Sequence, residues 1–332
     1  MFGPKSELRF IAASLITAAI VATPLTTSGA SAASETYPST VQFLSDKFVA
    51  GKALDGFTPG TPDFGFTMEA LLQRKAAGQK LTAQLTAVRA VLADTTIPAK
   101  SVISTYLYDS AKKIKPGLAG KFLFTSVALG VPNAPLRNAV VGDLKASVTS
   151  SGTLLGNPGN SFDYAWAALG LAAVGQSKVA NSIVMKLITQ EQPDGGFGTD
   201  QTGDTTKSST DATGISIQAI VLAKRTGAKS QVSVEQSALV AASKYLRANQ
   251  ISGNHWEAFG DVDVNGTAYA AMGLKAAGAN VASIQDWLKS RLAPSGGLST
   301  PWSNGLGDVF ATAQGFSALL GLSYLDLLPT KK

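Results

Sequence analysis

Two kinds of helix-forming pattern alternate along the chain. Residues 165–175 (AWAALGLAAVG) contain no charged residue, and this predicts a helix that is buried on all sides. The stretches 179–192, 236–250 and 281–293 place apolar residues at i, i+3, i+4 and i+7, as in a helix with one buried face. Small residues let helices approach closely. We therefore expect the first kind to form an inner layer and the second kind an outer layer.

The apolar helix recurs along the chain. Residues 165–175 and 268–278 share the order Ala-x-Ala-Ala-x-Gly-Leu at an offset of 103 residues. A second signature, Asp-x-x-x-Thr, begins at Asp63, Asp263 and Asp308. Aligning all the copies gives one equivalent site, the threonine position, occupied in turn by Thr67, Ala119, Tyr164, Thr213, Thr267 and Thr312. Six helical-hairpin units spaced by 52, 45, 49, 54 and 45 residues predict one all-α domain over 33–332, an α/α toroid (α6/α6 barrel).

The first 32 residues form a pattern of their own. Lys5 and Arg9 precede an apolar run over 10–22, and Ala30-Ser31-Ala32 matches a signal-peptidase site. A membrane-spanning helix needs roughly 20 residues, which this run does not reach. We therefore expect a secretory signal peptide over 1–32, cleavage near Ala32, no transmembrane anchor, and a secreted monomer.

Composition removes several kinds of chemistry. The chain has no cysteine and one histidine, His255, so it lacks a thiol nucleophile, a thioester and the ligands of a Cys-containing or multi-histidine zinc site. We expect no metal and no cofactor. The formal net charge is +6, but the basic residues are scattered and do not form the aromatic-interleaved stripe of a nucleic-acid-binding protein.

Loop motifs relate the sequence to a known superfamily. Residues 190–198 (QEQPDGGFG) follow the order Gln-x-x-Asp-Gly-Gly-aromatic, with weaker copies at 250–256 and 295–298. With the Asp-x-x-x-Thr-Ala helix starts, this resembles the terpenoid cyclase and protein prenyltransferase superfamily, in particular secreted bacterial prenyltransferase/squalene-oxidase repeat proteins. Transcobalamin-type carriers are a more distant similar group. The resemblance implies an α6/α6 ring, a fold that hosts cyclases, transferases and binding proteins alike.

The resemblance can be tested against the chemistry of that superfamily. Class II cyclases protonate an alkene with the middle acid of Asp-x-Asp-Asp-Thr-Ala, and the equivalent residue here is Asn265, which has no acidic proton. A prenyltransferase zinc site needs Cys and His. A sugar-cleaving enzyme needs two carboxyl groups roughly 5–10 Å apart, and the aspartates at the helix starts could supply them. A lyase using His255 or Tyr269 also stays open.

Two interpretations of the helix starts are compatible. Asp and Thr are preferred N-caps, each contributing about 1 kcal/mol, and helix N-termini around one mouth would also form a polar binding rim. Trp166 and Tyr269 occupy matching positions and either face the lumen or pack into neighbouring helices. The candidate ligand-binding residues are Asp63, Thr67, Asp163, Trp166, Asp211, Gln218, Asp263, Asn265, Tyr269, Asp308 and Gln314.

These observations favour a protein without catalytic residues that binds a small molecule, a glycan or a cell-envelope partner at its cavity or rim. The alternative is an enzyme of the toroid class. That enzyme would be either a diverged cyclase or prenyltransferase, or one that cleaves polysaccharides.

Overall fold

The computed structural model describes residues 37–48, 53–79, 81, 106–131, 135–155, 160–198, 207–227 and 231–329. The predicted signal peptide over 1–32 and its cleavage site lie outside these residues. In the described part of the chain, no helix is both long enough and apolar enough to cross a bilayer.

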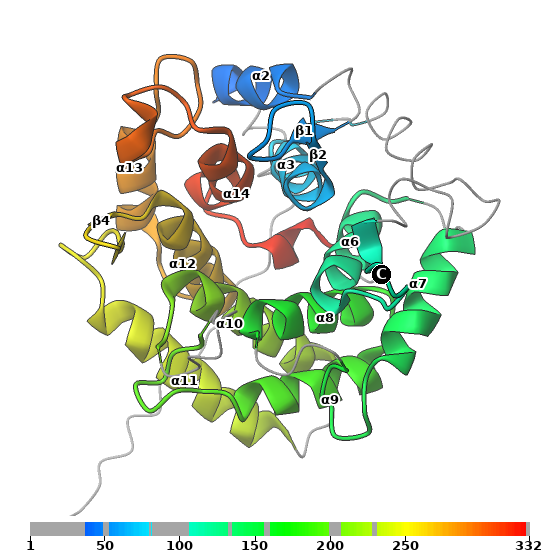
Figure 1. The fold of residues 1–332 in the computed structure, drawn as a ribbon. Coiled ribbons are helices and arrows are strands. Elements are labelled where there is room, and N and C mark those ends of the chain that lie inside the picture. Colours follow the sequence, from blue (N-terminus) through cyan, green and yellow to red (C-terminus); the bar gives the residue numbers. More distant parts are fainter. Residues whose placement is uncertain are drawn as a thin grey trace, which may run out of the picture.

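The apolar helices form an inner ring. They are α3 (Phe64–Ala76), α6 (Pro116–Ala128), α8 (Ser161–Ala173), α10 (Thr210–Thr226), α12 (Val264–Ala276) and α14 (Val309–Leu319). Each packs against the next, and α14 packs against α3, so that the ring is closed (Figure 1). This confirms the predicted fold class, an all-α toroid.

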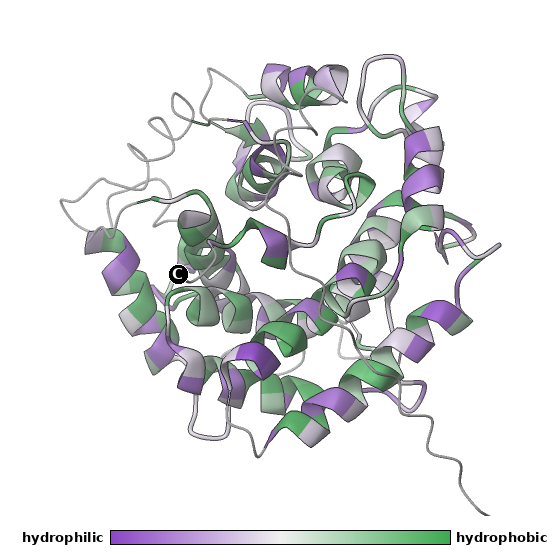
Figure 2. Ribbon diagram, turned by 180° about the vertical axis from the view of Figure 1, so that it is seen from behind, coloured by the Kyte–Doolittle hydropathy of each residue, from purple (hydrophilic) through white to green (hydrophobic). Residues whose placement is uncertain are grey.

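The amphipathic helices lie outside this ring. Those in the described residues are α2 (Pro38–Asp46), α7 (Pro135–Ala146), α9 (Ser177–Ile188), α11 (Val232–Ala248) and α13 (Ala282–Ser290). Hydrophilic and hydrophobic residues alternate along them, with the apolar side packed on the inner ring (Figure 2). Two short antiparallel pairs, β1 (Leu54–Asp55) with β2 (Pro62–Asp63) and β3 (Glu257–Ala258) with β4 (Asp261–Val262), precede α3 and α12.

Glycines bring inner helices into backbone contact. A methyl group added at Gly170 of α8 would lie 2.2 Å from the carbonyl oxygen of Gly120 in α6. The same relation links Gly273 of α12 to Gly214 of α10, at 2.5 Å. These small residues give the close approach that the sequence predicted, and a larger side chain would push the helices apart.

The Asp-x-x-x-Thr signature has a structural role at each helix start. The side chains of Asp63, Asp263 and Asp308 accept hydrogen bonds from the backbone amides of Phe66, Gly266 and Ala311, as N-caps do. The threonine hydroxyl accepts a bond from the preceding loop, as Thr67 does from the amide of Leu54 at 2.9 Å. Thr213, Thr267 and Thr312 hold their own loops in the same way. The motif therefore fixes each loop to its inner helix.

The end of the described chain turns into the ring. After α14 the short helix η3 (Tyr324–Leu327) lies inside the circle of inner helices (Figure 1). Tyr324 is fully buried, and its backbone amide donates to Gln218 Oε1 at 2.9 Å. Its ring centroid lies 5.3 Å from that of Trp166 and 6.3 Å from that of Tyr269. One end of the lumen is therefore filled by the protein itself.

Candidate functional site

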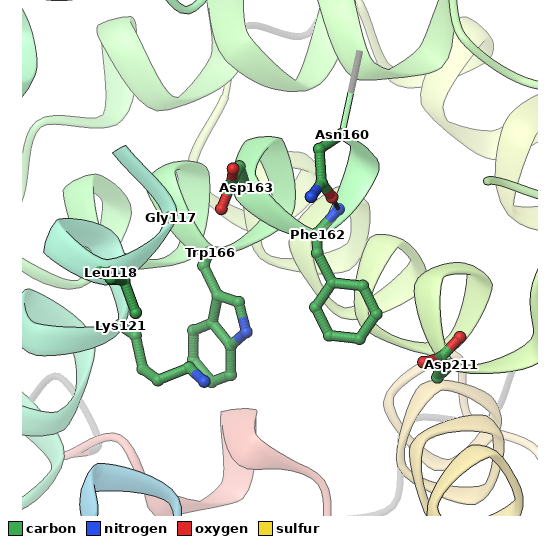
Figure 3. A pocket seen from close by; sticks show the side chains of 8 residues that line it. All are labelled: Gly117, Leu118, Lys121, Asn160, Phe162, Asp163, Trp166 and Asp211. Atoms are coloured by element: carbon green, nitrogen blue, oxygen red, sulfur yellow. Dashed lines mark hydrogen bonds between the residues drawn. The ribbon is translucent and has the colours of Figure 1, made fainter. Parts of the chain in front are cut away.

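A cavity of about 400 Å³ opens where α6, α8 and α10 begin. The side chains around it come from the first two turns of these helices (Figure 3). Most of them occupy equivalent positions in the repeat. Gly117, Phe162 and Asp211 stand two residues before the threonine position of their helices. Lys121 and Trp166 stand two residues after it. The lining consists of Gly117, Leu118, Lys121, Asn160, Phe162, Asp163, Trp166 and Asp211.

Asp163 has the most unusual environment in this lining. Asn160, not Asp163, is the N-cap of α8, because its Oδ1 accepts from the amide of Phe162 at 2.9 Å. The Asp163 carboxyl lies against the first turn of α6, where a methyl group at Gly117 would come 1.8 Å from Oδ1. Burial raises the pKa of Asp163 to about 6, and the positive charge of Lys121 opposes this rise. Near pH 6 this group can therefore both donate and accept a proton.

Asp211 supplies a second carboxyl group to the same cavity. Its Oδ1 accepts from the amide of Ala212 at 2.8 Å and from the hydroxyl of Ser209, the N-cap of α10. Asp263 lies close enough to Asp211 for the negative charge of Asp211 to affect the pKa of Asp263. Burial is the main cause of the raised pKa of Asp263, and the negative charge of Asp211 adds to it. In Figure 3, Asp163 and Asp211 stand on either side of Phe162.

A belt of side chains lies one level deeper, two residues after each threonine position. Its members are Glu69, Lys121, Trp166, Ile215, Tyr269 and Gln314. Glu69, which is 1% exposed, organises this belt. Its Oε1 accepts from Lys121 Nζ at 2.8 Å and from the Tyr269 hydroxyl at 2.7 Å, and its Oε2 accepts from Gln314 Nε2 at 2.9 Å. The bonds of this one carboxylate therefore connect α3 to α6, α12 and α14.

Aromatic groups make up part of the cavity wall. Lys121 Nζ lies over the ring of Trp166, 5.1 Å from its centroid, in a cation–π contact. Trp166 is 2% exposed, and its indole Nε1 has no hydrogen-bond partner among the described residues. Phe162 packs edge-on against Tyr269, with ring centroids 5.4 Å apart. The wall therefore presents an aromatic surface next to charged groups.

The structure places the predicted residues in three groups. Asp163, Trp166 and Asp211 line the cavity. A second group lies in the hydrogen-bond network below and beside the cavity: Tyr269, Asn265, Gln314 and Gln218. In this network Asn265 donates to Gln314, and Gln218 accepts from the backbone of the η3 segment. Asp63, Thr67, Asp263 and Asp308 form the helix starts, and Tyr106 also donates to Asp63 Oδ1, at 2.8 Å.

The sequence analysis missed Glu69 and Lys121. Each is a charged residue in the first two turns of an inner helix, and each stands two residues after a threonine position, like Trp166 and Tyr269. Extending the repeat register by two residues would have found both. Within the described ranges, no group of three His, Cys, Asp or Glu side chains is arranged to hold a metal ion.

The fold and the cavity define a class: α/α toroids with a cavity at the starts of the inner helices. No protein-family model and no curated protein matches the sequence. Solved structures do match the fold. A protein from Actinoplanes superposes with a TM-score of 0.61 at 14% identity, covering 87% of this chain and 99% of the other.

Two further similar structures carry a stated activity. An unsaturated glucuronyl hydrolase from Streptococcus agalactiae has a TM-score of 0.55 at 12% identity and covers 90% of this chain and 93% of its own. An unsaturated glucuronyl hydrolase specific for heparin has a TM-score of 0.55 at 12% identity, covering 92% of this chain and 99% of its own. At such identities the likeness shows the α/α toroid fold. The narrower tie to the terpenoid cyclases stays a prediction.

These neighbours correct the main functional expectation from the sequence. We expected a binding protein without catalytic residues, and the structures with a stated activity are hydrolases that act on glycans. The comparison therefore favours the alternative, an enzyme. That expectation rested on Asn265 in place of the cyclase acid and on the interpretation of the helix-start aspartates mainly as caps, whereas Asp163 is not the cap of its helix.

Proposed function

We propose that the protein is a glycan-cleaving hydrolase that works in the cavity at the starts of α6, α8 and α10. The observation that carries this proposal is Asp163, a carboxyl group with its pKa raised to about 6 that lines the same cavity as a second carboxyl, Asp211. Two such groups around one cavity are what glycoside hydrolysis requires.

The two carboxyl groups and the aromatic wall of the cavity have separate roles in this proposal. Protonated Asp163 donates its proton to the glycosidic oxygen as the bond to the anomeric carbon breaks. Water attacks that carbon, and Asp211 accepts the proton that the water loses, so one product carries a new anomeric hydroxyl and the other carries the hydroxyl formed from the glycosidic oxygen. Phe162, which is half-buried in the cavity wall, offers an aromatic face on which a sugar ring can pack.

The similar structures support the reaction class, because two of them are glycan hydrolases. The predicted signal peptide agrees with a substrate outside the cell, where glycan polymers are encountered. The cyclase resemblance supports the architecture only, since Asn265 donates a hydrogen bond to Gln314 where a cyclase needs an acid.

An activity screen tests the proposal. The mature chain, residues 33–332, is incubated between pH 4 and 7 with neutral, amino-sugar and uronic-acid oligosaccharides, including unsaturated glucuronyl ones. New reducing ends are then measured. Asp163→Asn should reduce cleavage by about 10²–10⁴, the usual contribution of a general acid. Asp286→Asn changes an exposed aspartate of α13 and is the matched control. Absence of cleavage of every glycan, or full activity of Asp163→Asn, contradicts the proposal.

A further inference from the structure

The cavity lining carries more negative than positive side chains. Three lining residues carry charge: Lys121, Asp163 and Asp211. Lys121 lies 2.8 Å from Glu69, which is almost fully buried, so this pair contributes no net charge to the cavity. The remaining charge that the lining contributes is negative. At neutral pH the cavity therefore attracts cations and repels anions.

Among the described residues near the cavity, one further carboxyl group adds to this negative charge. Asp263, next to Asp211, adds a further carboxyl group. Lys115, at the start of α6, is not part of the lining, and its Nζ lies over the ring of Tyr106, 5.7 Å from the ring centroid. Among the described residues, Lys121 is the only lysine or arginine in the lining.

An independent observation indicates a ligand with oxygen acceptors. The indole Nε1 of Trp166 is a buried donor that lacks a partner among the described residues, and such groups are uncommon because they cost free energy. In Figure 3 this nitrogen is on the edge of the indole that faces Phe162 across the cavity. A hydroxyl oxygen of a sugar packed on Phe162 would satisfy it.

We propose that the cavity takes a sugar unit carrying a free ammonium group, such as a hexosamine, in preference to a uronic acid. This inference rests on the proposed function and adds the charge of the substrate to it. It also separates the chain from the two glucuronyl hydrolases of similar fold, whose substrate groups carry a carboxylate.

Glu69 sets this preference through Lys121. While the carboxylate holds the ammonium group, Lys121 cannot offer a full positive charge to an anionic sugar. Glu69→Gln keeps the size of the side chain and can still accept hydrogen bonds, but it leaves the charge of Lys121 uncompensated. We expect this variant to bind uronic-acid oligosaccharides better and amino-sugar oligosaccharides worse. Glu69 is thus a positioning residue that determines specificity.

Binding measured by calorimetry tests the inference separately from cleavage. Three oligosaccharides of equal length are titrated into the mature protein at pH 7: glucosamine, N-acetylglucosamine and glucuronate-containing. The glucosamine oligomer should bind at least tenfold more tightly than the glucuronate oligomer, and the ratio should fall as salt is raised. Glu69→Gln should lower this ratio at least tenfold. Asp211→Asn, which removes a charge facing the cavity, should lower it in the same direction.

The outcomes separate the two proposals. Tighter binding of glucuronate by the wild type, or a ratio unchanged in a folded Asp211→Asn protein, overturns the charge preference and leaves a glycan hydrolase standing. Failure of all three sugars to bind, together with no cleavage in the glycan screen, overturns both. A circular dichroism spectrum checks that Glu69→Gln is folded, and if it is not, Asp211→Asn decides the result.

Discussion

The unusual state of Asp163 makes a quantitative prediction for stability. Burial moves the pKa of this carboxyl from 3.8 to about 6, so the folded protein holds the proton more tightly than the unfolded chain does. Each pKa unit corresponds to 1.36 kcal/mol, which gives about 3 kcal/mol in total. The contribution favours folding below about pH 4 and is lost as the pH rises through about 6.

Asp163→Asn removes this dependence, because an amide does not ionise. Relative to wild type, the free energy of unfolding of the variant should rise by about 2–3 kcal/mol between pH 4 and pH 7.5. Urea denaturation followed by tryptophan fluorescence at both pH values measures the difference. Asp286→Asn should keep a constant offset from wild type over the same range. If Asp163→Asn also keeps a constant offset, the carboxyl is not desolvated as described, and its role as an acid near pH 6 loses its basis.

Three further substitutions test other parts of the structure. Gly117→Ala places a methyl group where the Asp163 carboxyl lies, so we expect glycan cleavage to fall at least tenfold while circular dichroism stays unchanged; normal activity would contradict the packing. Thr312→Val leaves the amide of Leu298 without its acceptor and should cost about 1–3 kcal/mol in urea denaturation, and a neutral effect would argue against the loop-holding role. Tyr324→Ala removes a fully buried ring and should destabilise by about 3–5 kcal/mol, whereas a small loss would show that η3 adds little to the core.

The architecture was predictable because it repeats. The Asp-x-x-x-Thr signature recurs for a local reason, a cap and a loop contact made within some 16 residues, so it can be recognised from the sequence alone. The close approach of inner helices was likewise visible in the glycines of AWAALGLAAVG and AYAAMGLKAAG. Such features depend on residues that are close together in the sequence, so the sequence alone predicts them.

The site was only partly predictable, because its contacts join distant units. Glu69 reaches Tyr269, 200 residues away, and Gln314, 245 residues away, and no local pattern reveals those partners. The difference between Asp163 and the capping aspartates also depends on a neighbouring helix, since Gly117 of α6 provides the surface against which Asp163 is buried. The η3 segment was missed because one short turn carries no periodicity.

The closed ring distinguishes this protein from open solenoid repeats. In an open array the end units are covered by special capping repeats, and units can be gained or lost one at a time. Here Gln314 of the last inner helix bonds to Glu69 of the first described one, so the last unit is also a neighbour of the first. Loss or duplication of a single unit would break that contact. Exposed side chains of this fold can therefore change one at a time, whereas a change in the number of units requires a new contact between the last unit and the first.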